Sequence, residues 1–192
     1  YYISVSRSGT TSRMHFNGTQ VAINTSDSTN YSTSPNTSYI GTRYSLQQYF
    51  DGYMCDVRVV KGTALSDYTP PTAPLTAITN TKFLLNPETS ISDLSQKSEI
   101  QCFGDAATST TQVKFAGTKS IYLDGTGDYL QISNVEDSWI SGYTGDFTVE
   151  FWWYPTNVSN GNYQEIFTVG NGFQLYIYNG GGLSLALSSN NT

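Results

Sequence analysis

Residues 147–154 read FTVEFWWY, the most strand-like stretch of the chain. Successive side chains of a β-strand point to opposite faces of the sheet, so this stretch divides into two sets. One set is wholly apolar and is predicted to be buried between two sheets: Phe147, Val149, Phe151 and Trp153. The other set is aromatic with one carboxylate and is expected to line the open face of a curved sheet: Thr148, Glu150, Trp152 and Tyr154.

Similar short runs, separated by turn residues, continue through most of the chain. Residues 53–60 form one such run, and residues 173–178 and 183–187 flank the turn sequence Asn-Gly-Gly-Gly. The pair Asn17-Gly18 is a further strong hairpin signal. The sequence therefore predicts an all-β protein, a two-sheet antiparallel β-sandwich with almost no helix.

The composition supports this fold class and argues against two classes of partner. Charged residues make up 12% of the chain, against about 25% in ordinary globular proteins. The chain has 9 Lys and Arg against 15 Asp and Glu, and this net charge of −6 disfavours binding to the phosphates of nucleic acid. No apolar run approaches the roughly 18 residues that cross a bilayer, so membrane insertion is not expected.

One segment suggests a boundary within the chain. Residues 70–74 read PPTAP, which favours an extended and stiff connector. We therefore divide the chain into residues 1–75, a joint at residues 76–80 that ends this Pro-rich connection, and residues 81–192.

Several stretches resemble motifs of laminin-G-like (LamG) domains in the concanavalin A-like lectin/glucanase superfamily. FTVEFW at residues 147–152 resembles the FTVE-x-W strand of these domains, and IYLDGTGDYL at residues 121–130 resembles the hairpin that precedes it. FDGYMCDVRV at residues 50–59 resembles a strand near the end of such domains, as do VSRSGT at residues 5–10 and FNG at residues 16–18. The resemblance implies a concanavalin A-like jelly roll.

The order of these motifs differs from the order in the family. Residues 1–75 resemble the C-terminal-half strands of a LamG-like sandwich, and residues 81–192 resemble the N-terminal-half strands. The chain is therefore either a circularly permuted sandwich or a window that spans two tandem domains, as in repeated domains of marine phage structural proteins. We favour completion within one chain, which places residues 147–153 and 53–60 in the same sandwich.

The sequence argues against catalysis. Superfamily members that cleave glycans carry a tight acidic cluster on one strand, and a retaining mechanism needs two carboxyl groups about 5–5.5 Å apart. Glu150 has only Asp146 nearby, with Thr148 between them on the same face. We expect Glu150 to be the structural partner of a buried arginine such as Arg58, and we assign no catalytic residue.

Histidine and cysteine give no metal or nucleophile site. His15 is the only histidine and is expected at a surface position of a strand. Cys55 and Cys102 are expected to be free thiols, and one histidine with two distant cysteines is not a zinc set. A structural Ca²⁺ is the only cofactor that the sequence suggests, with Asp124 and Asp128 of the DGTGD loop as its ligands. A plain hairpin turn without a metal ion is the favoured interpretation of this loop.

Ligand binding is the function that the sequence favours. Aromatic platforms for a glycan are expected at Trp152, Tyr154, Tyr143, Tyr176 and Tyr178, although each of these side chains can equally pack within a sheet. The main hypothesis is a non-catalytic structural or adhesive module of a virion appendage such as a tail fibre. It would bind glycans, cell-surface polysaccharide, copies of itself or tandem neighbouring domains.

The alternative is an extracellular lectin-like domain of a cellular adhesin or of a carbohydrate-active enzyme. Both hypotheses place the chain outside the cell or on a virion surface.

Overall fold

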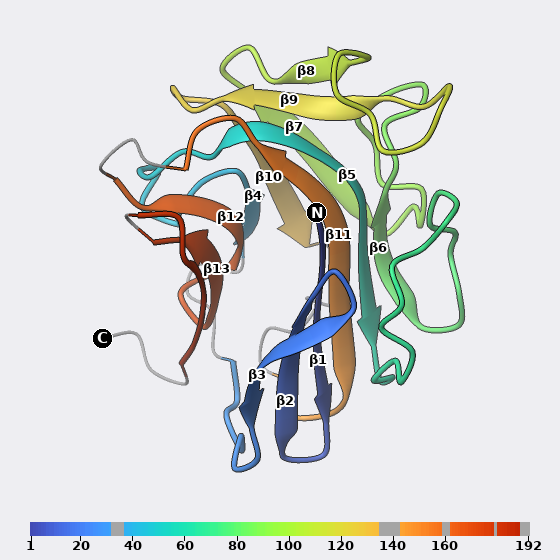
Figure 1. Ribbon diagram of the computed structural model, residues 1–192, viewed down its shortest axis with the longest axis vertical. Coiled ribbons are helices and arrows are strands. Elements are labelled where there is room, and N and C mark those ends of the chain that lie inside the picture. Colours follow the sequence, from blue (N-terminus) through green and yellow to red (C-terminus); the bar gives the residue numbers. More distant parts are fainter. Residues whose placement is uncertain (32–36, 135–142, 159–161, 179, 189–192) are drawn as a thin grey trace.

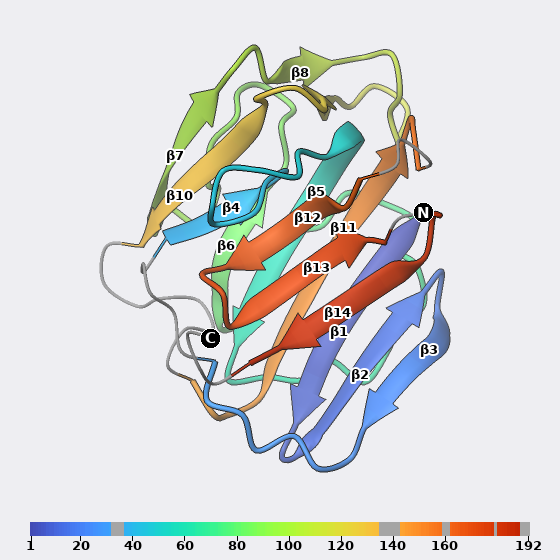
Figure 2. The same cartoon turned by 90° about the vertical axis from the view of Figure 1, so that its left-hand side faces the viewer.

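The computed structural model describes residues 1–31, 37–134, 143–158, 162–178 and 180–188, and within these ranges the chain forms fourteen strands and no helix. The described ranges accordingly contain no helix that could span a membrane. The strands form two antiparallel sheets that pack face to face, as Figures 1 and 2 show. The prediction of an all-β two-sheet sandwich is confirmed.

The larger sheet has eight strands. Its order is β3 (Thr19–Asn24), β2 (Thr11–Phe16), β1 (Tyr2–Ser8), β11 (Phe147–Pro155), β5 (Asp51–Lys61), β9 (Ser120–Asp124) and β8 (Ala107–Ser109), and β6 (Thr81–Leu85) also pairs with β5. The smaller sheet has six strands, in the order β14 (Leu183–Leu187), β13 (Phe173–Ile177), β12 (Gln164–Val169), β4 (Thr37–Ile40), β10 (Tyr129–Asn134) and β7 (Ser98–Phe103).

The core lies between the two sheets and is centred on β11. The four side chains that alternation predicts to be buried are at most 6% exposed: Phe147, Val149, Phe151 and Trp153. They join a single large apolar cluster to which both sheets contribute. The prediction for this face of the strand is confirmed.

The two halves of the chain complete each other within one sandwich. Strand β11 lies between β1 and β5, with Trp152 opposite Tyr2 on one side and Trp153 opposite Met54 on the other. The early strands therefore satisfy both hydrogen-bonding edges of β11. This pairing confirms the prediction of completion within the chain, and the alternative that placed these strands in different sandwiches is wrong.

The outer face of β11 is not open, and this expectation was wrong. Thr148, Glu150 and Trp152 are 0%, 2% and 6% exposed, and only Tyr154 reaches solvent, at 47%. Two loops cover this face, residues 62–80 and 110–119. Within them, the backbone N–H of Leu65 donates to the Thr148 hydroxyl at 2.9 Å, and the Phe115 ring lies 6.1 Å from the Trp152 ring.

Glu150 has the structural role that was expected. Arg58 donates from Nε at 2.8 Å and from Nη2 at 2.6 Å to Glu150 Oε1. The Tyr2 hydroxyl donates to the other carboxylate oxygen, and burial raises the pKa of Tyr2. Arg58 also donates to the carbonyl of Thr76 at 2.7 Å, so this cluster fixes the Pro-rich segment against the sheet.

His15 is buried, so the expectation of a surface position was wrong. Its ring stacks on Tyr68 with centroids 3.6 Å apart, and burial lowers the pKa of His15. Tyr68 lies in the covering loop at residues 62–80. Alternation within a strand does not predict the position of such a loop. Cys55 and Cys102 are both free, as predicted.

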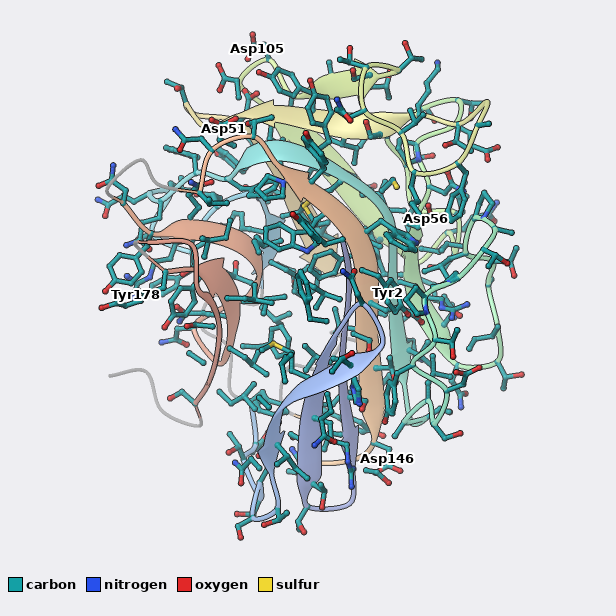
Figure 3. The ribbon with its side chains drawn as sticks, in the orientation of Figure 1. Tyr2, Asp51, Asp56, Asp105, Asp146 and Tyr178 are labelled. Carbon is teal, nitrogen blue, oxygen red and sulfur yellow. The ribbon has the colours of Figure 1, made fainter. Side chains whose placement is uncertain are left out.

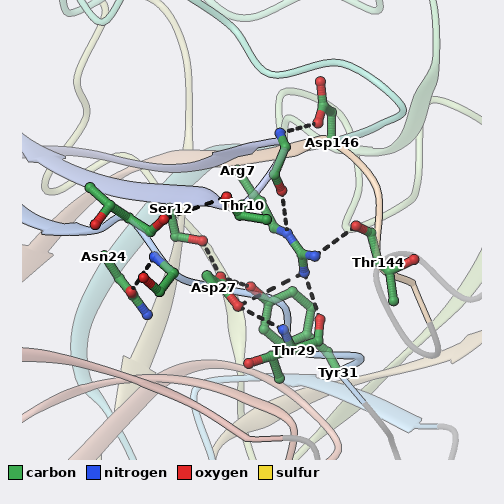
Figure 4. Close-up of polar contacts among 12 residues, drawn as sticks. Arg7, Thr10, Ser12, Asn24, Asp27, Thr29, Tyr31, Thr144 and Asp146 are labelled. Atoms are coloured by element: carbon green, nitrogen blue, oxygen red, sulfur yellow. Dashed lines mark hydrogen bonds and ion pairs between the residues drawn. The ribbon is translucent and has the colours of Figure 1, made fainter.

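A second buried polar network, which the sequence analysis did not identify, closes one end of the sandwich (Figure 4). Arg7 is 2% exposed and donates to the carbonyls of Gly9, Thr29 and Thr144 at 3.1, 2.6 and 2.6 Å. Asp27 accepts from Ser12 and Tyr31, and its oxygen lies 4.0 Å from Arg7 Nη1. The network ties the segment after β3 to the ends of β1 and β11.

Candidate ligand-binding cleft

A cleft of about 500 Å³ lies on the outer face of the six-stranded sheet. Strands β12, β13 and β14 and the loop at residues 41–50 form its walls. Its lining combines aromatic rings, amides, one guanidinium group and one carboxyl group: Arg43, Tyr44, Gln48, Tyr163, Glu165, Asn171, Gln174, Tyr176, Ala186 and Ser188. Such convergence of aromatic and polar groups is typical of ligand sites.

Strand alternation brings the floor of the cleft together. In β13, Phe173, Leu175 and Ile177 belong to the core, so the side chains between them face outward. Glu165 of β12 lies directly opposite Tyr176 of β13 in the antiparallel register. The register shifts between Glu165 and Phe167, and such bulges commonly re-aim side chains near functional sites.

The loop between β4 and β5 forms the wall that carries Arg43 and Tyr44. The backbone N–H of Arg43 donates to the carbonyl of Gln47 at 3.1 Å, which closes a tight turn. Gln48 adopts φ 62°, which is costly for a non-glycine residue, and its carbonyl accepts from the Glu165 N–H at 2.8 Å. This hydrogen bond holds the strained backbone of Gln48 against β12 at Glu165, whose side chain lines the cleft.

Three tyrosines form an aromatic cluster at the mouth of the cleft. The Tyr163 ring lies 5.8 Å from Tyr176 and 5.1 Å from Tyr178, and it is perpendicular to the latter. Tyr163 and Tyr178 are 38% and 49% exposed. In Figure 3, Tyr178 projects outward from the edge of the molecule, beside β13. The cluster thus offers exposed ring faces and edges to a ligand.

Glu165 is the most unusual group in the cleft. It is 2% exposed, and its Oε2 has no hydrogen-bond partner among the described residues. Burial raises the pKa of Glu165 to about 8, so the carboxyl group is mainly protonated at neutral pH. Arg43 Nε and Asn171 Oδ1 are likewise buried without a partner in the described structure. Unsatisfied buried polar groups are costly, and several in one cleft point to contacts that a ligand would supply.

The five side chains expected as glycan platforms do not form one site. Tyr176 lines the cleft, and Tyr178 lies beside it, with its ring 5.1 Å from that of the lining residue Tyr163. Trp152 is buried, with Lys114 Nζ 4.0 Å from its ring centroid, and Tyr143 lies 4.8 Å from Lys61 Nζ. Tyr154 lies on the eight-stranded sheet, in a row of side chains with Tyr53 and Tyr122, whose rings are 4.8 Å apart.

Sequence reasoning identified Tyr176 alone of the residues that line the cleft, and it missed Tyr163, Arg43 and Glu165 among others. Tyr163 and Arg43 lie in loops, where strand alternation predicts no orientation. Glu165 stands in a strand as an isolated carboxyl group. No local signal shows that the loop at residues 41–50 will bury it.

The two aspartates considered for calcium lie in an acidic cluster with Asp105. Carboxylate oxygens of Asp105, Asp124 and Asp128 lie within 4.8 Å of one another. Asp128 is fully buried and accepts from the backbone N–H groups of Asp105 at 2.8 Å and Asp124 at 3.0 Å. Both of its oxygens therefore already have backbone partners that brace the turn, and a structural Ca²⁺ at this cluster stays a prediction.

A larger hollow of about 720 Å³ lies at the side of the sandwich where β3 and β14 are edge strands. Its lining is mainly aliphatic and includes Val21, Ile23 and Leu185. It lacks the buried, unpartnered polar groups that distinguish the cleft on β12 and β13. The cleft is therefore the better candidate for a polar ligand.

Comparison with known proteins agrees with the fold. The family model Laminin_G_3, described as concanavalin A-like lectin/glucanases superfamily, matches residues 1–68. The match includes three of the motif regions noted in the sequence, VSRSGT, FNG and FDGYMCDVRV. No curated protein and no solved structure matches the chain. The similarity indicates a lectin-like or binding module at the coarse level.

Proposed function

We propose that the chain is a non-catalytic glycan-binding module whose site is the cleft on the six-stranded sheet. The observation that carries the proposal is the convergence of the Tyr163, Tyr176 and Tyr178 rings with the buried, unpartnered carboxyl group of Glu165. The partial match to a superfamily named for its lectins supports it. An adhesive role on a virion appendage and a role in a cellular extracellular protein would both use this site.

The chemistry of the cleft suits a sugar. A sugar ring has an apolar C–H face that packs on an aromatic ring, and hydroxyl groups that both donate and accept hydrogen bonds. The tyrosines supply amphipathic rings with polar tips. Gln48, Asn171 and Gln174 supply amide donors and acceptors.

The same cleft is poorly equipped for hydrolysis. Glycosidases use two carboxyl groups, about 5–5.5 Å apart for retention or about 6.5–9.5 Å apart for inversion. Glu165 is the only carboxyl group among the described residues that line the cleft. Glu150 lies on the other sheet and is paired with Arg58. We therefore assign binding without turnover.

The proposal is tested by affinity electrophoresis through gels that contain soluble polysaccharides, both neutral (laminarin, xylan) and acidic (alginate, polygalacturonate). We expect at least one of them to retard the wild-type protein. Tyr163→Ala is expected to weaken that binding about two- to tenfold, because an aromatic contact of about 0.5–1.5 kcal/mol is lost.

Tyr154→Ala is the matched control, since Tyr154 is also an exposed tyrosine, at 47% against 38% for Tyr163, but lies on the other sheet. It should leave the retardation unchanged. If none of the polysaccharides retards the wild-type protein, or if the two variants lose binding alike, the proposed site is wrong.

A further inference from the structure

Arg43 and Glu165 face the same cleft, and no ion pair joins them in the described structure. Arg43 is the only cationic side chain among the described lining residues. We propose that the cleft selects glycans that carry a carboxylate, namely uronate-containing chains, with Arg43 and Glu165 binding the ligand's carboxylate together. This inference rests on the proposed glycan-binding function of the cleft.

The guanidinium group of Arg43 is positioned to bind an anion. Its Nε is buried without a partner, and its carbon Cζ lies 5.2 Å from the centroid of the Tyr44 ring. Guanidinium groups stack on aromatic rings and bind carboxylates through two parallel hydrogen bonds. Stacking on Tyr44 holds the group at the wall of the cleft. The Nε–H of Arg43 has no acceptor among the described residues, and a carboxylate of the ligand would supply one.

Glu165 would complement this contact as a hydrogen-bond donor. A protonated carboxyl group has an O–H that can donate to a carboxylate oxygen, whereas an ionised one would repel it. The titratable groups that line the cleft with Glu165 are Arg43 and Tyr44 from the loop between β4 and β5, Tyr163 before β12, and Tyr176, which lies opposite Glu165 on β13. No second carboxyl group lines the cleft among the described residues.

A pH dependence follows from this arrangement. Below pH 8 the cleft presents Arg43⁺ and a neutral Glu165, which together favour a carboxylate. Above pH 8 Glu165 ionises, the local charge of the pair falls to zero, and the ligand's carboxylate meets a like charge. Affinity for a uronate chain is therefore expected to fall as the pH rises through about 8, while affinity for an uncharged chain is not.

The test compares oligogalacturonate and oligomannuronate with their methyl esters, in which a methyl group replaces the charge of each carboxylate and the sugar chain is unchanged. Calorimetric titration of the wild-type protein at pH 6 is expected to show at least about tenfold tighter binding of one acid than of its ester. The affinity for that acid is expected to fall at least about tenfold between pH 6 and pH 9. Arg43→Gln should remove the preference for the acid, and Glu165→Gln should make the affinity for the acid independent of pH.

The outcomes separate this inference from the proposed function. Equal binding of the acid and its ester would overturn the carboxylate inference while leaving a glycan-binding cleft intact. Binding of neutral polysaccharides alone would do the same. Failure of every acidic and neutral glycan to bind would overturn both proposals. The comparison of acid with ester uses the wild-type protein, so it decides the inference even if a variant does not fold.

Discussion

Phe151→Ala is expected to lower the free energy of unfolding by about 3–5 kcal/mol. Phe151 is fully buried at the middle of β11, opposite Ile3 of β1, and belongs to the core shared by both sheets. Because β11 pairs on one side with β1 and on the other with β5, its neighbours are fixed by hydrogen bonds and cannot readily collapse into the space left by the ring. The variant therefore loses both the transfer free energy of the ring and the contacts around the cavity.

Urea denaturation followed by far-ultraviolet circular dichroism measures this loss. Tyr154→Ala on the same strand is the control, because Tyr154 is 47% exposed and its truncation is expected to cost far less. A loss below about 1 kcal/mol for Phe151→Ala would contradict the assignment of this face of β11 to the core.

Glu165→Gln is expected to increase stability at neutral and alkaline pH. In the unfolded chain Glu165 ionises near its ordinary pKa of 4.5, whereas burial in the folded protein raises that pKa to about 8. The folded state therefore holds a proton that the unfolded state has lost. Stability from this group is fully present below pH 4.5 and is lost progressively as the pH rises to about 8, by up to about 1.4 kcal/mol per pH unit, or roughly 5 kcal/mol across the window.

Measuring the free energy of unfolding of both proteins from pH 5 to pH 9 tests this expectation. The glutamine variant has no proton to lose at this position, so its advantage over the wild type should grow with pH and level off above pH 8. Glu99→Gln, on the exposed surface of β7, should show no such trend. Parallel pH profiles for the wild type and Glu165→Gln would mean that Glu165 is ionised in the folded protein.

The fold could be predicted from local patterns. Alternation within residues 147–154 identified the core face of β11 because burial between two sheets follows the period of the strand itself. The outer face could not be predicted this way. Thr148 and Trp152 are buried by loops at residues 62–80 and 110–119, whose path depends on contacts far apart in the sequence.

The same limit applies to the candidate site. Tyr176 and Tyr178 could be placed together because they share one strand and the turn that follows it. Glu165 and Arg43 line the same cleft because β12 pairs with β4 in the sheet. These two strands lie more than a hundred residues apart in the sequence. The resemblance of short motifs to laminin-G-like domains indicated the sandwich, but it gave no information on this cleft.

Hydrogen–deuterium exchange is the most direct test of where the glycan binds. The proposed position is between the loop at residues 41–50 and strands β12 and β13. The exchange of the free protein is compared with that of the protein saturated with a polysaccharide that retards it in the gels. We expect slower exchange in residues 41–50 and 163–178 and no change in β9. Protection confined to the eight-stranded sheet around Tyr53, Tyr122 and Tyr154, or protection in no segment, would contradict it.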